Sequence, residues 1–168
     1  MPPSLWTLRW LALFFGFSCL GAPHSPAQTP ILQNLPGQTP LAQNQTAPIL
    51  TRIDDGYFYW RTMGYRETFR IWSRGGLLEN DKAFLRKVDS FAEVIAGLGA
   101  YVDHRILTVV PSGPSTYVLY DSARFEKGSV FFRFVVYTRY QEKYFNRIQW
   151  SLDPAEILPE YLMAGGVQ

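Results

Sequence analysis

The stretch that decides the fold is TYVLYDSARFEKGSVFFRFVVYT, residues 116–138. It contains two runs rich in β-branched and aromatic residues, 116–125 and 129–138, joined by only three residues, 126–128. Runs of this composition are typical of strands, and so short a connection makes the two strands antiparallel neighbours. The second run is almost wholly apolar, which predicts a strand in the middle of the sheet.

Two further strands extend this hairpin in both directions. The run RILTVV, 105–110, ends at a turn-forming PSGPS segment, and the run YFNRIQWS, 144–151, follows a short polar stretch. Four strands joined by short connections predict an antiparallel meander. After the last strand, Asp153 precedes Pro154 and Glu156, which is the pattern of a capped short helix.

Two helices are predicted before the sheet. The first spans 54–73 and its apolar stripe consists of Phe58, Tyr65, Phe69 and Trp72. The second is capped by Asn80, with Asp81 in its first turn, and its stripe consists of Phe84, Val88, Phe91, Ile95 and Leu98. The second stripe could form a homodimer seam, but it is short for a coiled coil and suits a helix lying on a sheet better. The expected fold is α+β, with two N-terminal helices packed on a curved four-stranded antiparallel sheet and a short C-terminal helix.

Residues 1–27 have the pattern of a secretory signal peptide. The apolar run 10–20 is too short to cross a bilayer, and Ser25 and Ala27 supply small residues before a cleavage point. We therefore expect a periplasmic or secreted protein with no transmembrane helix in the mature chain. Lipidation of Cys19 is an alternative, although the bulky Phe17 stands where lipoproteins carry a small residue.

The remaining chain divides by composition. Residues 28–51 contain no charge, four prolines and the near-repeats QTPILQN and QTPLAQN, which favours an extended Pro/Gln/Thr-rich linker that acts as a spacer, a tether or a partner-binding segment. Residues 52–160 are long enough for one domain with a single core. Residues 161–168 are expected to be a flexible tail.

Composition excludes several classes of function. Removing residues 1–27 takes away Arg9, Cys19 and His24, which leaves 15 Lys and Arg against 14 Asp and Glu, with His104 as the one histidine. The near-neutral charge argues against nucleic-acid binding, and a chain without cysteine has no thiol nucleophile and no disulfide. We expect no metal site and no cofactor.

Three segments carry a family resemblance: FAEVIAGLGAY at 91–101, FEKGSVFFRF at 125–134 and QWSLDPAEIL at 149–158. Together with the element order, they resemble small exported bacterial proteins of the NTF2-like, cone-shaped class. The resemblance implies a conical pocket between the helices and the concave face of the sheet. It implies no particular reaction, because the class contains isomerases, hydrolases, dehydratases and non-catalytic binding modules.

The candidate catalytic residues are Asp103, His104 and Asp121. Isomerase-like members of the class set an acid opposite a tyrosine or a protonated acid that stabilises an oxyanion. Asp103 and His104 could form a proton-transfer dyad, but neighbours at a strand entry point to opposite faces, which favours two exposed loop groups. Asp121 could point inward, but we expect a carboxylate at an edge or on the surface.

The candidate ligand-binding residues are Trp60, Tyr65, Trp72, Tyr120, Arg133 and Trp150. The aromatic members suit a pocket or a partner surface, although core packing explains most of them equally well. Alternation places Arg133 on one face of its strand and Phe132 and Phe134 on the other, so it is either a solvent-facing group or an anion-binding group paired with Asp121 or a ligand. The row Arg66, Arg70 and Arg74 is similarly a solvated helix face or an anion patch.

These patterns favour an exported, non-catalytic module that binds a small apolar or anionic ligand or a protein partner, as an accessory subunit of an envelope complex. The alternative is an enzyme of the ketosteroid-isomerase or dehydratase kind that uses an acid in the cone pocket. A purely structural subunit of a membrane-associated complex is a third interpretation.

Overall fold

The four predicted strands form one antiparallel sheet whose spatial order follows the chain, β1-β2-β3-β4. The computed structural model describes residues 43–140 and 142–164. Its elements are α1 (Gln43–Met63), α2 (Tyr65–Ser73), α3 (Lys82–Ile95), β1 (Tyr101–Gly113), β2 (Thr116–Phe125), β3 (Gly128–Arg139), β4 (Glu142–Ser151), the 3₁₀ turn η1 (Pro154–Glu156) and α4 (Glu160–Ala164). The expected signal peptide, Cys19 and most of the expected linker lie outside the described residues. The α+β class and the four-stranded antiparallel sheet are confirmed.

In the described part of the chain, three helices precede the sheet instead of the two that were predicted. The predicted helix over 54–73 is broken at Gly64, whose φ of 87° lies in the left-handed region that glycine adopts without strain. The break changes the helical phase, so the predicted stripe is wrong at Phe58, which is 63% exposed. The buried stripe of α1 is Ile49, Ile53, Tyr57 and Trp60.

Helix α1 also begins earlier than expected. It starts at Gln43 and includes Pro48, so residues 43–51 are helical and the expectation of an extended linker up to residue 51 is wrong for them. The prolines and missing charges suggested an extended chain, but Ile49 is fully buried and tertiary packing outweighs the local preference. Helix α3 carries its predicted stripe from Phe84 to Ile95, but it ends before Leu98. Its cap is Asp81 instead of Asn80, and the Asp81 carboxylate accepts from the backbone N–H of Ala83.

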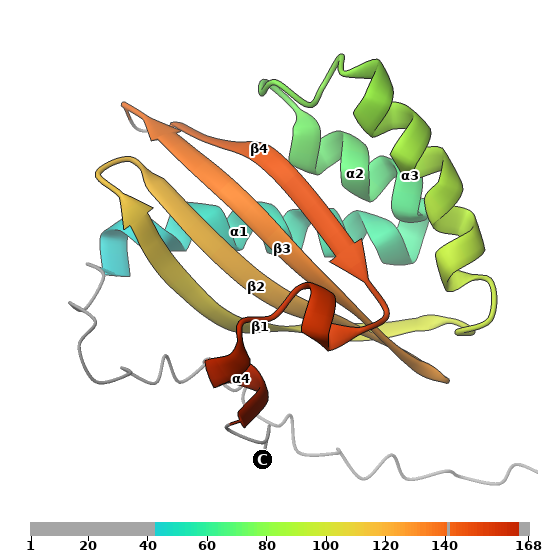
Figure 1. Cartoon of the computed structure of the whole chain (residues 1–168). Coiled ribbons are helices and arrows are strands. Elements are labelled where there is room, and N and C mark those ends of the chain that lie inside the picture. Colours follow the sequence, from blue (N-terminus) through green and yellow to red (C-terminus); the bar gives the residue numbers. More distant parts are fainter. Residues whose placement is uncertain (1–42, 141, 165–168) are drawn as a thin grey trace, which may run out of the picture. The chain divides into compact units, whose positions relative to one another are not determined.

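The sheet has two different faces. The inner face carries residues such as Leu119, Phe132, Phe134 and Ile148, which belong to one buried cluster with α1, α2 and α3. Figure 1 shows α1 crossing behind the strands, whereas η1 and α4 lie in front of them. We call the opposite side the outer face, and it carries Val118, Tyr120, Phe131, Arg133, Val135, Arg147 and Gln149.

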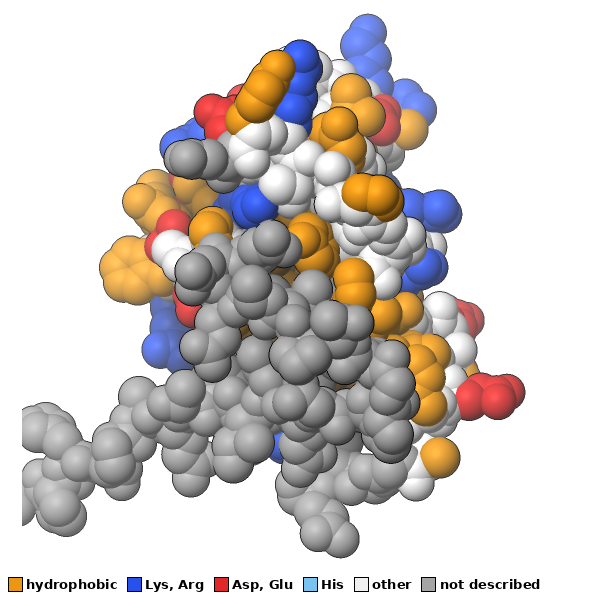
Figure 2. Space-filling view, turned by 90° about the vertical axis from the view of Figure 1, so that its left-hand side faces the viewer, with side chains coloured by type: hydrophobic (Ala, Val, Ile, Leu, Met, Phe, Trp, Pro, Cys, Tyr) orange, Lys and Arg blue, Asp and Glu red, His pale blue; other side chains and the backbone are white. Residues whose placement is uncertain are grey.

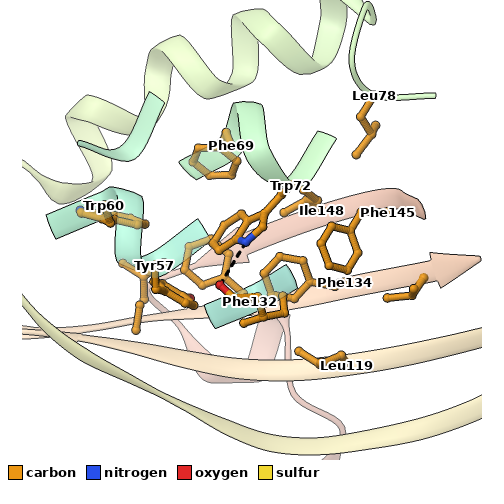
Figure 3. Packing of buried hydrophobic residues seen from close by; sticks show 14 of the residues in the cluster. Tyr57, Trp60, Phe69, Trp72, Leu78, Leu119, Phe132, Phe134, Phe145 and Ile148 are labelled. Atoms are coloured by element: carbon orange, nitrogen blue, oxygen red, sulfur yellow. Dashed lines mark hydrogen bonds between the residues drawn. The ribbon is translucent and has the colours of Figure 1, made fainter. Parts of the chain in front are cut away.

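The space between the helices and the inner face is filled with aromatic rings. Figure 3 shows the rings of Phe69 and Trp72 on the helix side of Phe132 and Phe134, with Trp60 to one side of them. Trp72 contacts Phe134 edge-on with ring centroids 5.0 Å apart, and its indole N–H donates to the carbonyl of Ile53 at 3.4 Å. The inner face of the sheet is therefore packed as a core.

The outer face is covered in part by the C-terminal segment. Ile157 and Leu158, each 8% exposed, pack with Val118 and Tyr120 of β2 in a second buried cluster. The predicted cap of this segment is confirmed, since the Asp153 carboxylate accepts from the backbone N–H of Ala155 at 2.9 Å.

Candidate functional site

A partly buried polar cluster joins α1 to the first two strands. It consists of Asp54 and Tyr57 from α1, His104 from β1 and Asp121 from β2, and we call it the His104 cluster. Asp54 and Tyr57 are three residues apart and so lie on the same helix face, toward the sheet. His104 and Asp121 both point from the inner face of the sheet, on neighbouring antiparallel strands.

The distances within the cluster are those of a hydrogen-bonded chain. The Tyr57 hydroxyl donates to Oδ2 of Asp121 at 2.5 Å. The other carboxylate oxygen of Asp121 lies 3.3 Å from Nδ1 of His104, whose Nε2 lies 3.2 Å from Oδ1 of Asp54. Both ring nitrogens of His104 thus face carboxylate oxygens, which accept and do not donate, so the imidazole satisfies both contacts only as the doubly protonated cation.

Burial and charge act together on the cluster. Asp121 is fully buried, and burial raises its pKa, although the contacts with His104 and Tyr57 oppose that rise. Burial by itself lowers the pKa of His104, but the hydrogen bonds and charges of Asp121 and Asp54 outweigh it and raise that pKa to about 9. Burial and the Asp121 charge together raise the pKa of Tyr57 well above its usual value. The raised pKa values of His104 and Tyr57 keep the imidazole protonated and the tyrosine neutral at neutral pH.

Aromatic rings hold the cluster in place. The Tyr57 ring stacks on His104 with centroids 4.0 Å apart and planes 20° from parallel. It also stacks on Tyr101 at 5.5 Å, and Tyr101 in turn stacks on Trp60 at 5.3 Å. The buried hydroxyl of Tyr101 has no hydrogen-bond partner in the part of the chain that the structure describes.

The structure separates Asp103 from His104. Asp103 forms an ion pair with Arg124 at the surface, away from the inner face where His104 contacts Asp121. The alternation argument against an Asp103–His104 dyad is therefore confirmed. The expectation that both residues are exposed loop groups is wrong, because both lie in β1 and only 17% of the His104 side chain is exposed. The expectation of an edge or surface position for Asp121 is also wrong.

The six candidate ligand-binding residues do not form one site. Trp60, Tyr65, Trp72 and Trp150 belong to or pack against the inner cluster. Tyr120 and Arg133 lie opposite each other on β2 and β3, on the outer face. The suggested pairing of Arg133 with Asp121 is therefore wrong, since the sheet separates them; Arg133 instead donates to the Gln149 side chain at 3.5 Å, and its buried Nε has no partner among the described residues.

The row of arginines on α2 is partly neutralised. Arg66 pairs with Asp89 of α3, and Arg70 pairs with Glu67 one turn before it. These two arginines border a shallow hollow of about 80 Å³ between α2 and α3, whose floor contains Phe69, Phe84 and Val88. A hollow of this size is well below the few hundred Å³ that small-molecule sites occupy.

Sequence reasoning missed Asp54 and Tyr57. The predicted stripe began at Phe58, the next residue along the helix, and so it turned Tyr57 away from the sheet. Register was a further obstacle, because β1 has irregularities between Tyr101 and Asp103 and between Ile106 and Thr108 that decide which residues of β1 and β2 meet. A stripe read as Ile49, Ile53 and Tyr57 would have identified Tyr57.

Residues 43–140 and 142–164 contain no group of three or more His, Cys, Asp or Glu side chains that could hold a metal ion. No helix within these ranges has the length and apolar character needed to cross a membrane. Comparison with protein-family models, with curated proteins and with solved structures finds no match to this chain.

Proposed function

We propose that this protein is an exported, non-catalytic module of the NTF2-like type that binds a protein partner, as an accessory subunit of an envelope complex. The observation that carries the proposal is the packed interior. The space where the cone-shaped class keeps its pocket is occupied by buried rings, among them Trp72 and Phe132, both fully buried. A small apolar ligand would have to displace them, whereas a protein partner needs only the surface.

The outer face supplies a surface with suitable chemistry. Arg133 stands between Phe131 and Val135 along β3, and Arg147 pairs in register with Val135 from the edge strand β4. Neither arginine forms an ion pair with another described side chain, and arginine beside apolar and aromatic groups is typical of interface anchors. The end of the molecule seen in Figure 2 carries hydrophobic side chains together with Lys, Arg, Asp and Glu side chains.

The test is complex formation by a double variant. The tagged chain is used to isolate a complex of defined stoichiometry from the envelope fraction of its source cells, in parallel with Arg133→Gln/Arg147→Gln. We expect at least tenfold weaker recovery of the partner with the double variant, because an interface arginine contributes about 1.4 kcal/mol or more. Arg86→Gln is the matched control, because Arg86 is exposed on α3 and away from the outer face.

Two results would contradict the proposal. One is the absence of any complex of fixed stoichiometry with the wild-type chain. The other is equal recovery with the wild-type chain and the double variant, provided that both melt at the same temperature. Recovery of a bound small molecule from the purified chain would instead favour the ligand-binding version.

A second candidate function rests on the His104 cluster. An acid hydrogen-bonded to a tyrosine and a histidine is the set that a proton-transferring enzyme of the ketosteroid-isomerase or dehydratase kind would use. Against it, Asp121 is fully buried and the described hollow lies elsewhere, between α2 and α3. The candidate predicts Asp121-dependent exchange of the α-protons of cyclohexanone into D₂O, followed by NMR; exchange no faster than with Asp121→Asn would dispose of it.

A further inference from the structure

The His104 cluster connects elements that are far apart in the sequence. Asp54 and Tyr57 belong to the first described helix, whereas His104 and Asp121 belong to the sheet, 47 or more residues later in the chain. One polar contact of α1 with the sheet here is direct, since the Tyr57 hydroxyl donates to Asp121. The other joins Asp54 to Asp121 through the imidazole ring of His104, and it depends on that ring carrying two protons, since Nδ1 and Nε2 both face carboxylate oxygens.

We propose that the His104 cluster is a proton-dependent latch that holds α1 against the sheet and releases it when the imidazole of His104 loses a proton. Neutral imidazole has one N–H and one acceptor nitrogen. After deprotonation, one of its two nitrogens therefore points an electron pair at the carboxylate of Asp54 or Asp121. The fully buried Asp121 also loses its neighbouring positive charge, which is costly in an apolar surrounding.

The charged and titratable groups around the ring favour the protonated form. From α1 come Asp54, Tyr57 and, one turn further, Arg61, whose guanidinium lies 5.7 Å from the centre of the Tyr101 ring. From β2 comes Asp121, and from β1 itself comes Tyr101. Two of these neighbours are carboxylates in direct contact, whereas the single cation among them, Arg61, contacts Tyr101 and the carbonyl of Val102.

The direction of the pH effect follows from the raised pKa. The folded-state pKa of His104 is about 9, above the value near 6.5 of a free imidazole. A raised pKa means that the contribution of the latch is fully present below about pH 6.5 and is lost as the pH rises through about 9. Opening of α1 should therefore become more frequent between pH 7.5 and 9.5, by about tenfold or more for a shift of this size.

The test measures opening of α1 separately from global unfolding. Two single-thiol variants are made in a Cys19→Ser background. Ile53→Cys places the thiol on the buried face of α1, where the native residue is 0% exposed, and Val88→Cys places it on the buried face of α3, where the native residue is 6% exposed. The labelling rate of each thiol by a disulfide reagent is divided by its rate in urea at the same pH, which removes the effect of thiolate formation. We expect the ratio of the corrected rate in Ile53→Cys to that in Val88→Cys to rise about tenfold from pH 7.5 to 9.5.

Variants assign the effect to the latch. In His104→Gln, the ratio should be high already at pH 7.5 and independent of pH. Asp54→Asn should raise the ratio at pH 7.5, whereas Asp55→Asn, which changes the next residue of the same helix without touching His104, should not. Because Asp54 is 63% exposed, its variant keeps the fold even if His104→Gln does not.

Three outcomes would overturn the proposal. The first is a ratio that does not change with pH, and the second is a parallel rise at both thiols, which would mean global unfolding. The third is equal behaviour of the Asp54 and Asp55 variants. None of these outcomes depends on whether a partner binds the outer face.

Discussion

Asp121 is the residue whose environment most needs explanation. It is fully buried between Leu119 and Ala123 on the inner face of β2, in a cluster that is otherwise apolar. An unpaired carboxylate in such a position would be too costly to keep ionised. The chain stabilises it with a cation, His104, and a short hydrogen bond from the Tyr57 hydroxyl.

Removing the Tyr57 hydroxyl tests this account. Tyr57→Phe keeps the ring that stacks on His104 but removes the hydroxyl that donates to Asp121. We expect a loss of about 1–3 kcal/mol in the free energy of unfolding, measured by urea denaturation, because a buried acceptor loses its partner. Tyr140→Phe is the control, because Tyr140 is 90% exposed, and it should change the stability by less than about 0.5 kcal/mol. Equal stabilities of the two variants would contradict a structural role for the hydrogen bond.

From the sequence, the position of a single residue could be predicted only where a periodic pattern determines which face it lies on. Alternation along 129–138 correctly separated Arg133 from Phe132 and Phe134. It could not place His104 beside Asp121, because irregular pairing along β1 changes the register by local geometry that no residue pattern announces. Asp121 was misjudged because a carboxylate is normally exposed unless it is paired, and the register that pairs it with His104 could not be predicted.

At the scale of elements, glycines decide how the first two helices meet. Gly64 separates α1 from α2 with a positive φ, and Gly56 lies where a Cβ atom would be 2.0 Å from the Trp72 indole. Thr68 of α2 reinforces the contact, since its hydroxyl donates to the carbonyl of Gly56 at 2.9 Å. The composition of 54–73 showed one helix because the amphipathic pattern continues across Gly64, and a single glycine is an ambiguous signal for a break.

The Gly64 break gives a prediction with a closely matched control. A Cβ atom at Gly64 or at Gly97 would have no heavy atom within 4 Å, but only Gly64 has a positive φ, of 87°. Gly64→Ala should therefore lower the free energy of unfolding by about 1 kcal/mol, as expected for a left-handed conformation. Gly97→Ala should be neutral or stabilising by about 0.5 kcal/mol. Thermal melting of both variants measures the difference. Similar melting temperatures would mean that a side chain at position 64 does not strain the backbone.

For the whole molecule, the arrangement follows from covering a sheet whose two central strands carry apolar side chains on both faces. Residues of β2 alternate between the two buried clusters, with Leu119 in the inner one and Val118 and Tyr120 in the outer one. Three helices cover the inner face, whereas the described cover of the outer face is one short segment. The sequence predicted this sheet and the capped C-terminal segment from composition, but it contained no information about which face each helix would cover, since that depends on tertiary packing.

Because the two faces of the sheet are covered to different extents, a leucine-to-alanine substitution should destabilise the protein by different amounts on the two sides. Leu119→Ala empties a fully buried position in the inner cluster, so it should cost about 3–5 kcal/mol of unfolding free energy. Leu158→Ala, at a site 8% exposed in the short segment between a 3₁₀ turn and a five-residue helix, should cost only about 2 kcal/mol because this segment can settle into the space. Leu158→Ala should also bind more of the dye ANS at low denaturant than wild type, as the cover loosens while the sheet stays folded. Leu152→Ala, at a site 49% exposed, should do neither. If Leu158→Ala cost as much as Leu119→Ala with no gain in dye binding, the C-terminal segment would be part of a single cooperative core, and the outer face would then be less accessible to a partner than the proposed function requires.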